Sequence, residues 1–241
     1  MKIRTLLLAI LSLFIMNQMF AKEIETDSFK TKDGKTVTVH FIQHASLYFT
    51  FEGLTIYADP VNYKGVDYKT LPKADLILIT HDHYDHLDKG AIEDIITTNT
   101  VIYCNKPVLD ALKEGKELRN GEQASFRDII EIEAVPAYNT TEGREMYHPK
   151  GRDNGYVITM GGSRIYIPGD CENMPEMKQL KEIDVAFLPI NQPYTMTIEQ
   201  AITAARTIKP QILYPIHYSD TDLTGLAILK KEGIEVRIFK M

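Results

Sequence analysis

The stretch that most constrains the fold is a strand of the buried type that runs directly into a cluster of histidines and aspartates. Residues 74–80 contain Leu-Ile-Leu-Ile, a continuous apolar run that predicts a strand covered on both faces. The next six residues hold three of the seven histidines and two aspartates, namely His81, Asp82, His83, Asp85 and His86. Imidazole and carboxylate suit zinc and related divalent ions, and a loop at a strand end presents side chains from a rigid base. The pattern predicts a metal site rather than a merely solvated loop.

The remaining sequence predicts strands in two groups with helices interspersed. No internal repeat or linker follows residue 22, so residues 22–241 are expected to form a single domain. The grouping favours two sheets packed together and covered by helices. Further strands are predicted over residues 36–42, 46–51, 54–58, 101–104, 129–135, 155–159, 164–167, 185–189, 212–216 and 236–239. Helices are predicted over residues 90–96, 108–114, 175–183, 197–208 and 222–232, the fourth opening with a capping box of Thr197 and Gln200.

The first residues follow the order of a secretory signal. Lys2 and Arg4 precede an apolar run over residues 6–15, and Ala21 follows a short polar stretch. We therefore expect a signal peptide over residues 1–21, export to the periplasm or the medium, and no stable membrane insertion afterwards. An uncleaved N-terminal anchor is the alternative, because Met19 stands where a small residue is preferred.

The composition limits the partners of the chain. A formal net charge of -6 and a pI near 5.7, without a basic stripe, argue against nucleic-acid binding. A small-molecule substrate is expected instead, and the oligomeric state stays open. Cys104 and Cys171 are too few for a disulfide framework. Two unpaired thiols are favoured over a bridge.

Two further candidates for metal ligation follow predicted strands later in the chain. Asp170 comes after Arg-Ile-Tyr-Ile-Pro-Gly, where Gly169 permits a tight turn or a close backbone approach. His217 comes after Ile-Leu-Tyr-Pro-Ile. Each alone would more often be structural, but with the first cluster they place metal-type side chains at the ends of three strands.

These motifs, in this order, resemble those of the metallo-β-lactamase superfamily. The match covers residues 59 to 217, and its most specific part is Thr-His-Asp-His-Tyr-Asp-His. The resemblance implies an αββα sandwich of two mixed sheets between helices, with one or two divalent ions at one edge. Zn²⁺ is expected, with Mn²⁺ or Fe²⁺ as alternatives. It also implies the following roles: His81 and His83 hold one ion, Asp85, His86 and His217 hold the other, Asp170 bridges them, and Asp59 supports the metal loop from behind.

The chain departs from the family pattern at one expected ligand. The family usually supplies a further histidine after the next strand, and here that position holds Asn139, in Val-Pro-Ala-Tyr-Asn. His148, nine residues later, could replace it, could touch substrate, or could be an exposed loop residue. His44 is interpreted as a structural hydrogen-bonding residue. Tyr194 is a candidate substrate contact near a helix start.

The resemblance implies hydrolysis by a metal-bound hydroxide. Asp85 would hold an ion and orient the attacking water. The scissile bond of a small substrate could belong to an ester or lactone, a phosphodiester or an amide, and the motif does not choose among them. The alternative is a non-catalytic metal-binding sensor or scaffold, which the substitution at Asn139 keeps open.

Overall fold

The structure is a computed structural model that describes residues 24–63 and 65–241. The expected signal peptide, residues 1–21, lies outside the described residues. Strands β1–β7 form one seven-stranded sheet in chain order, and β8–β14 form a second with the same simple order. The first sheet consists of β1 (Glu25–Lys30), β2 (Thr36–Gln43), β3 (Ser46–Phe51), β4 (Leu54–Ala58), β5 (Leu76–Ile79), β6 (Val101–Cys104) and β7 (Lys116–Glu117). The second consists of β8 (Gln123–Phe126), β9 (Ile130–Ala137), β10 (Asp153–Met160), β11 (Ser163–Ile167), β12 (Ile183–Pro189), β13 (Ile212–Ile216) and β14 (Glu235–Val236).

Each sheet begins as an antiparallel meander of four strands and continues with parallel strands. β1 to β4 pair antiparallel, and β4 to β7 pair parallel. In the second sheet β8 to β11 pair antiparallel, and β11 to β14 pair parallel. Parallel neighbours need a crossover, which explains why the helices follow the meanders. The crossovers contain η1 (Tyr68–Thr70), α2 (Lys89–Ile95), α3 (Lys106–Leu112), η2 (Pro175–Gln179), α4 (Ile198–Ile208) and η3 (Thr224–Glu232).

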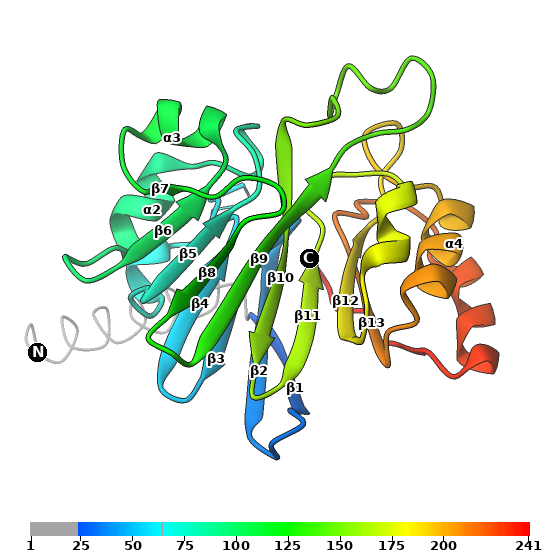
Figure 1. Ribbon diagram of the computed structural model, residues 1–241, viewed down its shortest axis with the longest axis horizontal. Coiled ribbons are helices and arrows are strands. Elements are labelled where there is room, and N and C mark those ends of the chain that lie inside the picture. The colour runs from blue at the N-terminus through cyan, green and yellow to red at the C-terminus, as the bar shows by residue number, and fades with distance from the viewer. Residues whose placement is uncertain (1–23, 64) are drawn as a thin grey trace, which may run out of the picture.

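The packing confirms the predicted αββα class. Figure 1 shows α2 and α3 beside one sheet and α4 beside the other, with the two sheets between them. Along β5, Leu76 and Leu78 enter the core between the sheets, while Ile77 and Ile79 pack under the helices of the first sheet. Both faces of β5 are therefore buried, which is why its sequence is a continuous apolar run.

Most predicted elements agree with the structure, and the differences lie at the edges. The helix predicted over residues 175–183 ends at Gln179, because Ile183 already begins β12. The helix predicted from residue 222 is a 3₁₀ helix from Thr224, and the last strand is the short β14 rather than residues 236–239. The capping box of Thr197 and Gln200 is present at the start of α4. Cys104 and Cys171 are free and buried, as favoured. None of the described helices is both long and apolar enough to cross a membrane.

Candidate metal centre

Two backbone hydrogen bonds join the sheets around the metal-type side chains. The carbonyl of Thr80, at the end of β5, accepts from the amide of Asn154 in β10 at 3.1 Å. The amide of His217, after β13, donates to the carbonyl of His44 between β2 and β3 at 2.8 Å. Because the two bonds fix strand ends from different sheets to one another, loops far apart in sequence meet at one edge of the sandwich.

The first group of candidate ligands consists of His81, His83 and His148. One ring nitrogen from each lies within 4.8 Å of the others. The ring centroids are 4.6 Å apart for His81 and His83 and 4.8 Å apart for His83 and His148. His81 and His148 are buried. Of the three readings left open for His148, the structure therefore excludes an exposed loop residue and places the ring beside the two predicted ligands.

Asn139 follows β9 and is buried. Its side-chain amide donates to the carbonyl of Tyr194 at 2.8 Å and to that of Arg144 at 3.3 Å. Its backbone amide donates to the carbonyl of His148 at 2.9 Å. Asn139 therefore ties together the loops that carry His148 and Tyr194, while its own Oδ1 is buried without a hydrogen-bond partner.

The second group consists of His44, Asp85, His86 and His217, again with candidate ligand atoms within 4.8 Å of one another. The sequence interpretation did not place His44 here. Its Nε2 lies 3.1 Å from Oδ2 of Asp85, and its ring centroid lies 3.6 Å from that of His217. His44 adopts a positive φ of 56°, which turns the chain sharply between β2 and β3. Nothing in the local sequence Gln-His-Ala-Ser predicts that His44 joins a ligand group. His40, which stacks on Tyr48, belongs to neither group.

Asp170 lies between the two groups. Its Oδ1 is 3.2 Å from Nε2 of His86, and its Oδ2 is 3.2 Å from Nε2 of His217 and 3.5 Å from Nε2 of His148. The predicted role of Gly169 is confirmed: its φ is +64°, and a Cβ there would meet Thr80 Cβ and the Asn154 carbonyl at 2.8 Å each. A side chain at Gly169 would push Asp170 away from the centre.

Asp59, at the end of β4, is buried behind the metal loop. Its Oδ1 accepts from the amide of Thr80 at 2.8 Å, and its Oδ2 accepts from the Thr80 hydroxyl at 2.7 Å. The same Oδ2 lies 2.8 Å from Nδ1 of His86. The arrangement directs the other nitrogen of His86 towards Asp170, as the predicted supporting role requires.

The donor set fits a divalent cation. Several buried polar atoms of the two groups have no hydrogen-bond partner: Nε2 of His81 and His86, Oδ1 of Asp170, and both ring nitrogens of His217. His86 Nε2 and Asp170 Oδ1 are near each other, but their orientation is poor for a hydrogen bond. Unpartnered buried polar atoms are costly, typically about 1–3 kcal/mol each, and a cation between them would satisfy them together.

The electrostatics also favour a cation. Burial alone would raise the pKa of Asp170, but His217 and His86 outweigh it and lower that pKa well below its usual range. Burial opposes the charged form of His217, yet Asp170 and Asp85 raise its pKa to about 9. Burial lowers the pKa of His81 well below its usual range, so this ring is neutral. The carboxylates thus attract positive charge, which protons supply unless a metal ion replaces them.

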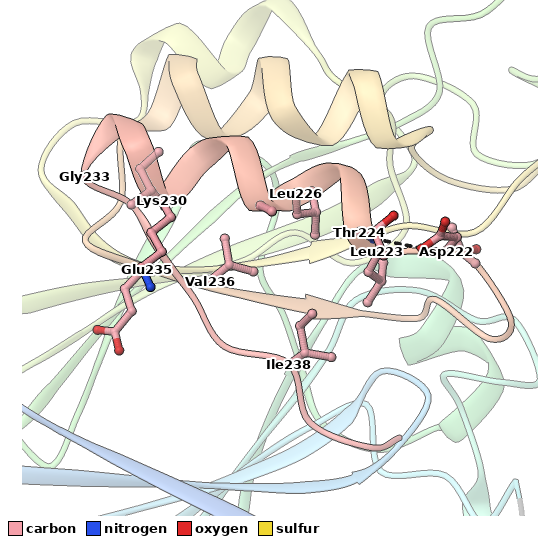
Figure 2. A pocket seen from close by; sticks show the side chains of 12 residues that line it. Asp222, Leu223, Thr224, Leu226, Lys230, Gly233, Glu235, Val236 and Ile238 are labelled. Atoms are coloured by element: carbon pink, nitrogen blue, oxygen red, sulfur yellow. Dashed lines mark hydrogen bonds between the residues drawn. The ribbon is translucent and has the colours of Figure 1, made fainter.

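A separate apolar groove of about 910 Å³ lies between η3 and the C-terminal segment, as Figure 2 shows. Leu223, Leu226, Val236 and Ile238 line it together with Lys230. Its lining includes none of the clustered histidines or Asp170. The groove is therefore distinct from the candidate metal centre.

Comparison with known proteins defines the class. Residues 38–217 match the family model described as the β-lactamase superfamily domain. The chain therefore belongs to this superfamily. A UPF0173 metal-dependent hydrolase from Archaeoglobus fulgidus is 32% identical over 182 residues, which cover 69% of this chain and 78% of the relative.

Solved structures share the fold. A candidate metal-dependent hydrolase from Parabacteroides distasonis is 52% identical, with a TM-score of 0.88, and the match covers 91% of this chain and all of that one. A metallo hydrolase from Ignicoccus hospitalis, 24% identical, shares the fold with a TM-score of 0.69 over 84% of this chain and 94% of that one. The protein is accordingly an enzyme, a metal-dependent hydrolase of the metallo-β-lactamase superfamily.

Proposed function

We propose that the protein hydrolyses a small-molecule ester or lactone, phosphodiester or amide with the help of one or two divalent ions, most suitably zinc. The observation that carries the proposal is Asp170, which lies within 3.5 Å of histidines from both ligand groups. His81, His83 and His148 would hold one ion. The second would be held by Asp85, His86 and His217, and Asp170 would be shared. A bound divalent ion supplies an activated water and a polarised substrate oxygen.

Asp85 is proposed to orient the attacking water and accept its proton. Its Oδ2 lies 3.1 Å from Nε2 of His44 and 3.7 Å from Nε2 of His217. Burial opposes the charge, but these histidines outweigh it and lower the pKa of Asp85 below its usual range. The carboxylate is therefore ionised and held in place. His44 would act as a positioning residue that keeps Oδ2 of Asp85 directed at His217.

The test is a hydrolysis screen of the metal-loaded protein over lactones, other esters, phosphodiesters, thioesters and β-lactams, followed by Asp85→Asn. General acid–base groups typically contribute 10²–10⁴-fold, so turnover should fall at least about a hundredfold. Asp82→Asn is the matched control, because Asp82 is in the same loop but pairs with Arg152 and belongs to no ligand group. Metal content is measured for both variants. Equal turnover with metal retained would refute the role of Asp85.

The structure bears on the alternative of a non-catalytic metal-binding protein. The substitution at Asn139 kept that alternative open, whereas the nearness of His148 to His81 and His83 supports a three-histidine group. Hydrolysis is the function that the complete set supports better.

We also infer that the protein is exported. The inference rests on the charged-then-apolar order between Lys2 and Ala21. Export would place the enzyme, with a small-molecule substrate rather than a nucleic acid, in the periplasm or outside the cell.

A further inference from the structure

Exposed apolar side chains gather beside the candidate metal centre. Seven large hydrophobic side chains are exposed in the described part of the chain, and four of them are Tyr63, Tyr84, Met146 and Tyr194. Tyr84 is 76% exposed and Met146 is 78% exposed. Single exposed apolar residues need no explanation, but a group of them beside a site indicates a binding surface.

The backbone and ring contacts connect this group to the candidate ligands. Tyr84 lies between His83 and Asp85 in the metal loop. The ring centroid of Tyr63 is 5.3 Å from that of His44 in a stacked arrangement. Tyr194 is held through its carbonyl by the side chain of Asn139 at 2.8 Å.

The aromatic side chains also contact one another. The ring centroids of Tyr63 and Tyr84 are 6.3 Å apart. Tyr147, the neighbour of Met146, packs edge-on against Tyr194 at 5.0 Å. We call Tyr63, Tyr84, Tyr147 and Tyr194 the aromatic rim. Four separate loops contribute to it, those that follow β4, β5, β9 and β12.

The cations described near the rim are already paired with acids. Arg152 forms ion pairs with Asp82 and Asp153. Arg144 lies 3.4 Å from the buried carboxylate of Glu172 and hydrogen-bonds Gln192. Lys64 lies outside the described residues. The described surface thus offers aromatic faces rather than free guanidinium groups, which phosphate recognition normally uses.

We propose that the aromatic rim binds an uncharged, planar apolar group of the substrate, so that esters or lactones bearing an aromatic group are preferred to phosphodiesters. The inference rests on the proposed hydrolytic function. Aromatic rings stack on one another in offset or edge-on geometry, and tyrosine combines an apolar face with a polar tip. Such a surface recognises a flat group without fixing a charge.

The test compares two neutral esters with the same leaving group, ethyl acetate and ethyl 1-naphthylacetate, on the metal-loaded full chain. The naphthyl ester should have the higher kcat/KM, mainly through a lower KM. Tyr84→Ala and Tyr194→Ala should each reduce the ratio of the two kcat/KM values about two- to tenfold, the range measured for aromatic pairs. Tyr84→Phe should retain the ratio, because the ring remains. Ile129→Ala, which removes an exposed apolar residue before β9, is the matched control.

The outcomes separate this inference from the proposed function. Equal kcat/KM for the two esters, or unchanged ratios in both alanine variants, would overturn the inference while hydrolysis stands. If no substrate is turned over, equilibrium dialysis measures how tightly the parent and Tyr84→Ala bind 1-naphthylacetamide, and this comparison tests the rim. Weaker binding by Tyr84→Ala than by the parent would support the rim and refute only hydrolysis. Equal or absent binding would overturn both.

Discussion

Replacing Asp59 with asparagine should weaken metal binding, although Asp59 is not itself a candidate ligand. The carboxylate accepts three hydrogen bonds, two from Thr80 and one from Nδ1 of His86, all at 2.7–2.8 Å. Asp59→Asn can keep an oxygen for the amide of Thr80, but its NH₂ group would face His86. Because two donors cannot pair, His86 is expected to change tautomer and to place a proton on Nε2, the atom directed at Asp170.

The expected loss of metal affinity follows from the lost orientation of His86. Removing a partner that orients a metal-binding histidine typically costs 10- to 100-fold in metal affinity. That corresponds to about 1.4–2.8 kcal/mol of binding free energy. The fold should survive, because Asp59→Asn is nearly isosteric and its side-chain oxygen can still accept from the amide of Thr80.

The assay is a competitive zinc titration of chelator-stripped protein, with circular dichroism to confirm folding. The matched control is Asp75→Asn, immediately before β5, the strand that pairs with β4. Asp75 accepts from the amide of Thr55 and pairs with Arg127, remote from the ligand groups. Asp75→Asn should bind zinc like the parent. If folded Asp59→Asn also binds zinc with the parent's affinity, the orientation of His86 does not depend on Asp59 and the reasoning is refuted.

Three further predictions use other parts of the chain. His148→Asn should lower the zinc content measured by elemental analysis from about two ions per chain towards one, because the first group keeps only two histidines; an unchanged content would remove His148 from the set. Thr197→Ala should reduce the free energy of unfolding in urea by about 0.5–2 kcal/mol while zinc content stays constant, since one half of the capping box is lost. N-terminal sequencing should find Lys22 or a near neighbour first on protein outside the cytoplasm, whereas intact Met1 on soluble cytoplasmic protein would contradict export.

The sequence predicted the interior strands better than the edge strands. The predicted ranges 46–51, 54–58, 101–104 and 212–216 coincide with β3, β4, β6 and β13. β1, β7 and β8 were not predicted. β1 buries only one of its six side chains, so it carries no alternating apolar pattern and depends on the hydrogen bonds that β2 offers.

The sequence by itself determined the chemical type of the site. The histidines and aspartates of the metal loop, Asp170 and His217 all follow strands, and their order along the chain gave the superfamily. This information is local, because it depends on residue type and on the nearest strand. Even Gly169 could be interpreted, since a glycine before an aspartate at a strand end predicts a close backbone approach.

Only the tertiary structure decided which remaining histidines join the site. The sequence offered His148 as a replacement ligand and interpreted His44 as structural, but it could not show which of these rings reaches the site. The positive φ of His44 and its backbone hydrogen bond with His217 bring one ring to Asp85. The backbone bond between Asn139 and His148 holds the other loop beside the first group. Hydrogen bonds between distant segments fix these loop paths, and the residue types at the contacts do not encode which segments will meet.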